Sequence, residues 1–310
     1  MKNLRTITYA RDGRIARITL NRPHRGNGIT MDMPLEIAAA VEQANLDPEV
    51  HVIALAGNGT GFSGGYDLVA SAEGTLDDDS RPNRPEGSVL DPIVQTENHV
   101  EGKAWDPTVD YAMMSRNVRG FMSLFHSEKP VVCKVHGYCV AGGTDLALCS
   151  DLLVIAEDAK IGYPPARVWG MPTTALWAHR IGIEKAKRLL FTGDCLTGKE
   201  AHAWGLAIEC APPAELDQRF EALLVRIARM PKNQLVMTKL LLNQTVLSQG
   251  LAGTQLLGTV FDGIARHTEE GYAFQRLAIE KGFKEAVRSR DEPFGDFGLD
   301  GFRSGKSKTP

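Results

Sequence analysis

Residues 131–151 join a short β-rich run, a glycine-containing turn, and a run of small and apolar residues, and this stretch constrains the fold more than any other. The pattern predicts a buried strand over 131–135, then a turn, then a buried helix from Asp145 onward. Because Gly142 and Gly143 lack a Cβ, the backbone there can approach a bound group closely. Free N–H groups at a helix start stabilise negative charge on a carbonyl oxygen, as in an oxyanion hole. Close packing of the helix on the strand is the alternative explanation for these glycines.

A second window repeats this arrangement earlier in the chain. The apolar residues 52–56 predict a strand, and residues 57–68 follow it with five glycines. Two such turns can face one carbonyl oxygen. The sequence therefore predicts that the two glycine turns meet in space.

The composition excludes several classes of protein. With 310 residues, 43% of them hydrophobic, the chain is long enough for a large core. A net charge of −3 without a dense Lys/Arg run argues against nucleic acid as a partner. No apolar run approaches the roughly 20 residues that span a bilayer, and the N-terminus has no apolar signal core, so we expect a cytoplasmic protein. The five cysteines lack metal-ligand spacing and are expected to be reduced, buried thiols.

Turn and capping signals predict further elements. Asp12-Gly13 predicts a hairpin turn between two strands, and residues 34–46 predict a helix with proline at its start. Apolar residues at helical spacing between 114 and 125 predict an amphipathic helix with a buried stripe. Residues 197–200 predict a capping box. From residue 214 the chain reads as mainly helical, with Gly250 and Gly253 as an interruption.

Several motifs, taken in order, resemble the signature of the crotonase (enoyl-CoA hydratase/isomerase) superfamily. The residues that carry the resemblance are Leu20-Asn21-Arg22-Pro23 with Asn27, Phe62-Ser63-Gly64-Gly65-Tyr66-Asp67-Leu68, Lys129-Pro130-Val131-Val132, His136-Gly137, Ala141-Gly142-Gly143-Thr144-Asp145-Leu146-Ala147, and Thr192-Gly193-Asp194 with Ala201 and Gly205-Leu206. The resemblance covers most of residues 12–290.

The resemblance implies an α/β fold: a spiral of β-β-α turns followed by a C-terminal helical region. It implies a core over residues 1–212 with a long insertion at about 69–110. The region 213–290 would serve assembly into a trimer or a dimer of trimers, and residues 291–310 would form a tail.

The resemblance also implies an acyl-CoA thioester as ligand, with coenzyme A carried by the substrate and with no separate cofactor or metal. The backbone N–H groups of Tyr66 and Gly142 would be the paired donors to the thioester oxygen. The other expected substrate-binding residues are Arg25 near the nucleotide phosphates, Gly65, Asp67 and Leu68 beside the pantetheine thiol, and Pro165.

The acid–base positions differ from those of the family's hydratases, which hold one water between two glutamates. The first glutamate corresponds here to Asp145, which is one methylene shorter. The second corresponds to Pro165, and proline cannot transfer a proton. Asp145 is therefore the expected catalytic carboxylate, although an acidic residue in the first turn of a helix also complements the helix dipole without any catalytic role.

Residues 69–110 are polar, acidic and interrupted by prolines, and they are expected to form a long loop. A solvated surface insertion and a lid near the acyl end of the pocket are both open readings. In the second reading Glu97, His99, Asp106 and Asp110 are candidates to reach the site.

Three functions remain open from the sequence. The first is an enzyme that resembles enoyl-CoA hydratase, in which an oxyanion hole stabilises a thioester enolate while Asp145 moves a proton. The second is another crotonase reaction, either isomerisation of a double bond or hydrolytic C–C cleavage. The third is a catalytically weak homologue that binds acyl-CoA. The acyl group and the choice between trimer and hexamer stay open.

Overall fold

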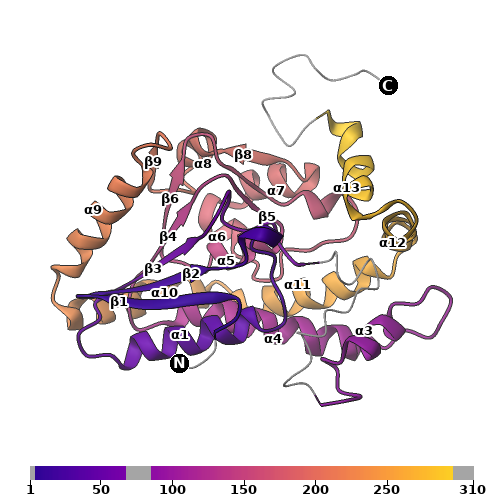
Figure 1. Ribbon diagram of the computed structural model, residues 1–310, viewed down its shortest axis with the longest axis horizontal. Coiled ribbons are helices and arrows are strands. Elements are labelled where there is room, and N and C mark those ends of the chain that lie inside the picture. Colours follow the sequence, from indigo (N-terminus) through magenta and orange to yellow (C-terminus); the bar gives the residue numbers. More distant parts are fainter. Residues whose placement is uncertain (1–3, 68–84, 296–310) are drawn as a thin grey trace.

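A six-stranded sheet forms the centre of the computed structural model, which describes residues 4–67 and 85–295 (Figure 1). Its strands are β1 (Ile7–Asp12), β2 (Ile15–Leu20), β3 (Val52–Gly57), β4 (Val131–Val135), β6 (Leu152–Ala156) and β9 (Glu209–Ala211). The strand order is β1-β2-β3-β4-β6-β9, with β1 antiparallel to β2 and the other pairs parallel. The hairpin predicted at Asp12-Gly13 is confirmed, and Gly13 adopts the positive φ of 55° that this turn requires.

A second, three-stranded sheet contains β5 (Tyr138–Val140), β7 (Lys160–Gly162) and β8 (Cys195–Thr197). The chain passes from β4 in the first sheet to β5 in the second, and then through the short helix α5 (Gly142–Ala147) back to β6 and on to β7. This alternation is a spiral of β-β-α turns, and it confirms the predicted fold class together with the helices that follow.

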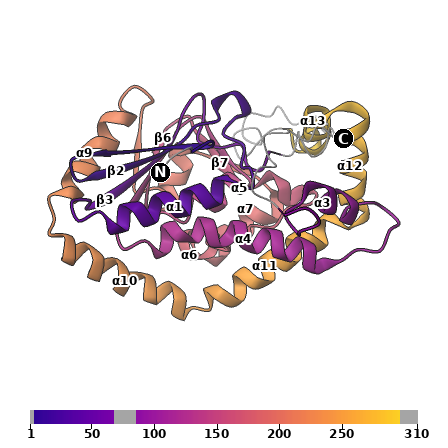
Figure 2. The same ribbon diagram turned by 60° about the horizontal axis from the view of Figure 1, so that its bottom comes forward.

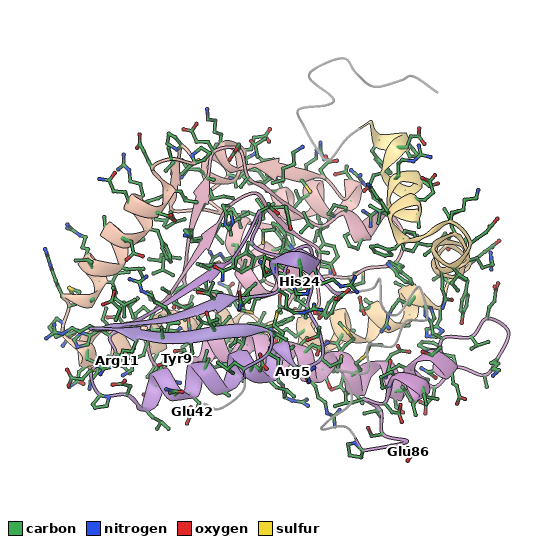
Figure 3. All side chains as sticks on the ribbon, in the orientation of Figure 1. Arg5, Tyr9, Arg11, His24, Glu42 and Glu86 are labelled. Atoms are coloured by element: carbon green, nitrogen blue, oxygen red, sulfur yellow. The ribbon has the colours of Figure 1, made fainter. Side chains whose placement is uncertain are left out.

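One helix covers the β1–β2 end of the sheet and packs against a second helix. Helix α1 (Met33–Leu46) contacts both of these strands and lies against α4 (Pro107–His126), as Figure 2 shows. The apolar stripe predicted between residues 114 and 125 is buried along α4, because its period of three to four residues places it on one face. On the outer side of α1 the exposed Glu42 projects away from the sheet (Figure 3).

Helices dominate the rest of the chain. They are η1 (Pro23–Arg25), α3 (Pro92–Asn98), η3 (Pro164–Arg167), α6 (Trp177–Ile181), α7 (Ile183–Thr192), α8 (Gly198–Ala203), α9 (Leu216–Ala228), α10 (Lys232–Ser248), α11 (Leu251–Arg266), α12 (Glu269–Lys281), α13 (Phe283–Asp291) and η4 (Glu292–Phe294). The predicted capping box at the start of α8 is confirmed. Across the described ranges, no helix combines the length and the apolar character needed to cross a membrane.

The prediction of a continuous loop over 69–110 is wrong for its described part. Helix α3 begins at Pro92 and α4 begins at Pro107, and each is preceded by an aspartate that caps it. The Asp91 carboxylate accepts a hydrogen bond from Ile93 N at 2.9 Å, and the Asp106 carboxylate accepts one from Thr108 N at 2.8 Å. An Asp-Pro pair can therefore start a helix as well as end one, since proline fits the first helical position. Residues 68–84 lie outside the described residues.

The helix break predicted around Gly250 and Gly253 is also only partly right. Gly250 ends α10 and precedes α11, with a left-handed φ of 85°. Gly253 lies inside α11, where an added Cβ would meet no heavy atom within 4 Å. A glycine at an exposed helical position weakens the helix without ending it.

Helix α10 is fastened to the core by Lys239, of which only 5% is exposed. Its ammonium donates to the carbonyl oxygens of Leu124 and Lys129 and lies 2.8 Å from Asp151 Oδ2. The same Asp151 oxygen accepts a hydrogen bond from Val131 N at 2.6 Å. Asp151 thus has the structural role of joining β4 to α10.

Replacing Lys239 with Met is expected to lower the free energy of unfolding by about 3 kcal/mol, because the change leaves a largely buried carboxylate without its cation. Urea unfolding followed by far-UV circular dichroism measures the loss. Lys232→Met is the control, since that ammonium forms an exposed hydrogen bond to Pro48 O and no ion pair within the described residues. Equal losses in the two variants would contradict the role given to the buried lysine.

Candidate active site

The first glycine turn is held in place by Asn27, whose side chain is buried. The side-chain amide of Asn27 donates to Asn58 O at 2.8 Å and to Gly61 O at 3.0 Å, and the backbone carbonyl of Asn27 accepts from Ser63 Oγ at 2.9 Å. These bonds connect the chain after β2 with the turn that follows β3. They explain why an asparagine is required at this position.

The two predicted glycine turns meet at Gly65, as the sequence led us to expect. Gly65 has a φ of +95°, and an added Cβ would lie 2.7 Å from Ala141 Cβ and 3.2 Å from Gly142 N. Ala141 itself adopts φ 54° and ψ −132°, a conformation that is uncommon for a residue with a Cβ. Helix α5 begins immediately afterwards at Gly142, three residues before the predicted start at Asp145.

Two backbone N–H groups at this junction are unused. Backbone hydrogen bonds from Ile29 N to Gly65 O and from Asp67 N to Ile29 O lie on either side of Tyr66. Within the described residues, neither Tyr66 N nor Gly142 N donates a hydrogen bond. The Tyr66 ring packs on the helix start, since a Cβ on Gly142 would lie 2.7 Å from Tyr66 Cε2. The two turns therefore bring the backbones of Tyr66 and Gly142 close together, and their role as paired donors of an oxyanion hole stays a prediction.

Asp145 lies in the first turn of α5 and is 1% exposed. Its Oδ1 accepts hydrogen bonds from Thr174 N at 3.0 Å and from Thr174 Oγ1 at 2.8 Å. Its Oδ2 is buried and has no hydrogen-bond partner in the part of the chain that the structure describes. Burial raises the pKa of Asp145 to about 7, while the bonds from Thr174 oppose the rise. A carboxyl group with this pKa can both give and take a proton at neutral pH.

Other buried polar groups lie near Asp145. Thr173 Oγ1 is buried and lacks a hydrogen-bond partner among the described residues, and the buried Tyr66 hydroxyl lies near the side chain of Asn117. Burial, followed by the charges of Asp145 and Asp262, raises the pKa of Tyr66 well above its usual value. Buried polar atoms of this kind require a polar partner, which a substrate or its water can supply.

Asp262 is a residue that the sequence reasoning missed. It lies on α11 with 8% of its surface exposed, and its Oδ1 accepts a hydrogen bond from Met171 N at 3.3 Å. Burial raises the pKa of Asp262, and the neighbouring Arg266 opposes the rise. The available signal was a helical face of small and polar residues in an otherwise apolar segment, namely Gly258, Thr259, Asp262 and Gly263, all of which are buried.

Arg25 and Asp67, two predicted substrate-binding residues, contact one another. Asp67 Oδ2 lies 3.4 Å from Arg25 Nε and 2.8 Å from Arg22 Nη2. Arg22 also donates to Gly28 O. The Asp67 side chain is thus directed toward these two arginines, and Arg25 stays partly exposed. Leu68, the next predicted residue, lies outside the described residues.

Pro165 occupies the turn η3, where it organises the backbone. Its carbonyl oxygen accepts hydrogen bonds from the backbone N–H groups of Val168, Trp169 and Gly170, each at 3.0 Å. Gly170 is required close by, since an added Cβ would lie 2.4 Å from Pro165 Cβ. The residue therefore shapes the turn that leads to residues 171–174, which carry Thr174 to Asp145.

The candidates from the insertion take different positions. Glu97 and Asp106 are exposed. Asp110 is buried, accepts from Trp105 Nε1 at 2.6 Å, and lies 2.9 Å from Arg266 Nη2. His99 Nε2 lies 2.9 Å from Arg266 O. The structure thus brings Asp110 and His99 to Arg266, and it places none of the four in a hydrogen bond with Asp145.

Two further features bear on the location of the site. A surface cavity of about 540 Å³ lies between α1 and α10, and its lining includes none of the predicted site residues. Within residues 4–67 and 85–295, no group of three or more His, Cys, Asp or Glu side chains is placed to hold a metal ion.

Comparisons with known proteins identify the family of this chain. The family profile described as enoyl-CoA hydratase/isomerase matches residues 10–104 and 104–276. A solved structure of an enoyl-CoA hydratase from Mycobacterium smegmatis is 57% identical, covers 96% of each chain and superposes with a TM-score of 0.88. A protein of Mycobacterium tuberculosis H37Rv, named provisionally as an enoyl-CoA hydratase, is 34% identical over 78% of this chain and 74% of its own length. The crotonyl-CoA hydratase of Syntrophomonas wolfei is 27% identical over 74% of this chain and 77% of its own length.

Proposed function

The chain belongs to the enoyl-CoA hydratase/isomerase family, within the crotonase superfamily, and from this premise we propose that it hydrates a 2-enoyl-CoA thioester. One observation carries the proposal: two backbone donors that have no acceptor among the described residues, Tyr66 N–H and Gly142 N–H, lie near the buried Asp145, whose Oδ2 has no partner among the same residues. An acyl-CoA processing enzyme needs this combination of an oxyanion hole and a proton-transfer group.

In the proposed reaction the thioester oxygen accepts hydrogen bonds from Tyr66 N–H and Gly142 N–H. As the oxygen atom of water bonds to the β carbon, the electron pair of the double bond moves toward the thioester and gives an enolate, which these donors stabilise. Asp145, which Thr174 positions, gives its proton to the α carbon, and the proton that the attacking water loses returns to the site to restore the carboxyl group, which completes the 3-hydroxyacyl product. Coenzyme A enters as part of the substrate, and the partly exposed Arg25 is suited to one of its phosphates.

Isomerisation of the double bond is the second candidate, and Pro165 is the observation that favours it. A proline stands where the family's hydratases have their second glutamate, and a single carboxylate suffices for isomerisation. Asp145 would remove a proton from one carbon and return it to another, with no net consumption of water. Hydrolytic C–C cleavage and binding of acyl-CoA with weak catalysis are the remaining alternatives.

The test is loss of the enoyl-thioester absorbance when the purified protein meets short, medium and bulky 2-enoyl-CoA esters, with Asp145→Ala and Pro165→Glu run in parallel. Loss that depends on Asp145 and yields a 3-hydroxyacyl-CoA supports hydration. Measurable binding of the ester without its consumption would overturn hydration. A 3-enoyl-CoA converted to the conjugated isomer would then establish the second candidate.

We also propose that the chain assembles as a trimer or a dimer of trimers. The support is a set of large apolar side chains exposed on α10 and α11, which are Met237, Leu240, Leu241, Leu242, Leu256, Leu257, Phe261 and Ile264. These helices run along one side of the molecule in Figure 2. Exposed apolar surface of this extent marks an interaction site.

Leu241→Glu is expected to shift the protein to a smaller assembly, because Leu241 is 72% exposed in the single chain and a buried charge at an interface is costly. Size-exclusion chromatography with light scattering gives the mass directly. Gln244→Glu is the control, as it adds the same charge to an exposed polar position of α10. A wild-type mass equal to one chain would contradict the assembly.

A further inference from the structure

One short segment, residues 171–174, receives two carboxylates from different parts of the chain. Asp145 Oδ1 accepts from Thr174 N, and Asp262 Oδ1 accepts from Met171 N. Three peptide units span at most about 11 Å, so the two backbone donors cannot lie farther apart than this. The segment thus brings the carboxylate of Asp145, on α5, and that of Asp262, on α11, close to each other.

Close packing of α11 on this segment fixes the position of Asp262. An added Cβ on Gly258 would lie 3.2 Å from Pro172 O, so the helix approaches the backbone directly. Gln255 lies one helical turn before Gly258, and its Nε2 donates to Thr174 O at 3.0 Å. Gly258 and Asp262 are four residues apart and share a face of α11. The helix therefore cannot move away from the segment without breaking these contacts.

The surroundings of the two carboxyl groups differ in charge. Asp262 Oδ2 lies 3.4 Å from Arg266 Nη2, and the same nitrogen lies 2.9 Å from Asp110 Oδ1. Asp145 forms no ion pair within the described residues and has hydrogen bonds from Thr174 on one oxygen only. The nearby cation favours the ionised form of Asp262, whereas Asp145 can carry a proton on its free Oδ2.

We propose that Asp262 is the second proton-transfer group of this site and acts together with Asp145. It would take the role that a second glutamate has in the family's hydratases, where this chain has Pro165. The inference rests on the proposed function, and it concerns a residue from the C-terminal helical region. Asp262 takes a proton from the attacking water as the water oxygen bonds to the β carbon. Asp145 gives its proton to the α carbon. After the product leaves, one proton passes from Asp262 to Asp145, which restores both groups.

The electrostatic effect of Asp145 and Asp262 on each other and on nearby groups agrees with these two proton-transfer roles. The charge of Asp262 adds to the raised pKa of Asp145, although burial contributes most. Both carboxylates also raise the pKa of Tyr66 and of Tyr163, again after burial, so the two phenols border both groups. The titratable groups that face the pair are Tyr66, Cys139, Cys149, Tyr163, Asp110 and Arg266.

The decisive experiment compares Asp262→Asn with the wild type in the full chain, using three readouts. These are kcat on a 2-enoyl-CoA ester, affinity for a saturated acyl-CoA of the same length, and titration of the Asp145 carboxyl carbon by NMR. We expect kcat to fall by about 100-fold or more with affinity changed by only a few fold. We also expect the pKa of Asp145 to fall, because a neighbouring negative charge is removed.

A second variant keeps the test informative if Asp262→Asn folds poorly. Arg266→Gln leaves the Asp262 carboxyl in place but removes the neighbouring cation, which should raise the pKa of Asp262. Because Asp262 acts as the base, the acidic limb of the pH–rate profile should move to higher pH. Asp151→Asn is the control, since this carboxylate is tied to Lys239 and Val131 away from the pair, and it should leave kcat and the titration unchanged.

Two results would overturn the inference. One is an Asp262→Asn variant with wild-type kcat and an unchanged pH–rate profile. The other is an Asp145 titration that does not respond to Asp262→Asn, since the groups would then not face each other. Failure of the proposed function would give a different result, because the wild type would then bind the ester without consuming it. In that case Asp262 would have no proton-transfer role, even if the titration showed that Asp145 and Asp262 face each other.

Discussion

Asp145→Asn is expected to abolish most turnover and at the same time to make the protein more stable at pH 8. The loss of activity follows from the removal of the group that gives the proton, which is worth about 100- to 10,000-fold. The gain in stability follows from the burial of that carboxyl group, which raises its pKa from 3.8 to about 7. An ionised group in such a place is unfavourable, and the uncharged amide retains an oxygen for the two bonds from Thr174.

The effect on stability depends on pH in a defined direction. Below about pH 4 the Asp145 carboxyl group is protonated in both the folded and the unfolded chain, so its ionisation does not change the free energy of unfolding. Between about pH 4 and 7 it ionises only in the unfolded chain, and the folded state loses stability progressively. Above pH 7 the loss is complete, and a difference of about three pKa units corresponds to at most about 4 kcal/mol.

Thermal unfolding of the wild type and of Asp145→Asn at pH 5 and pH 8 checks this expectation. The difference in midpoint should be several degrees at pH 8 and clearly smaller at pH 5. Asp151→Asn is the matched control and should be less stable than the wild type at pH 8, because its carboxylate is paired with Lys239. An Asp145→Asn variant that is destabilised equally at both pH values would contradict the raised pKa.

Gly65→Ala is expected to lower kcat by about 100- to 1,000-fold, as does loss of an oxyanion donor in other enzymes. The added Cβ would approach Ala141 Cβ to 2.7 Å and Gly142 N to 3.2 Å, and it would stand at a φ of +95°. Something must shift, and both neighbours belong to the turn that supplies the second donor. The two N–H groups would then no longer point to one oxygen.

The adjacent Gly64→Ala variant is a close control for this prediction. A Cβ there would meet its nearest neighbours at 3.6 and 3.9 Å, which is ordinary contact distance, and its φ is outside the left-handed region. Steady-state kinetics on both variants, with thermal unfolding to compare their stability, separates a damaged donor pair from general loss of the fold. Equal activity in the two variants would show that the 65–142 contact does not set the donor geometry.

The elements that the sequence predicted best are those with a strictly local cause. The buried strands have continuous apolar runs, Asp12-Gly13 specifies its own hairpin, and Thr197 with Glu200 specifies its own helix start. The helix that starts at Pro92 and the first turns of the helix that starts at Pro107 were missed, because they lie in a segment whose polar, acidic and proline-containing composition predicted a loop. The start of α5 was placed late because glycines were assigned to the turn, although Gly142 and Gly143 have the first helical positions.

For the candidate site too, the sequence predicted the features with a local cause and missed those that depend on the folded chain. The turns that carry Tyr66 and Gly142 were predicted from short glycine motifs, whereas the donor role of the two residues was implied by the family resemblance and stays a prediction. Asp262 could not be predicted, because its proximity to residues 171–174 depends on how α11 packs after the whole chain has folded. The pKa of Asp145 was likewise beyond the sequence, because it depends on burial by residues distant in the chain.

The cysteines give this fold a set of internal probes. Four of the five thiols are buried, and burial raises the pKa of Cys139 and of Cys149 well above the usual value, so neither presents the reactive thiolate in the closed structure. Cys139 lies in β5 and Cys149 lies just after α5, so they bracket the helix that carries Asp145. The rate at which an alkylating reagent labels them measures how often this helix opens, with Cys210 as the more exposed reference.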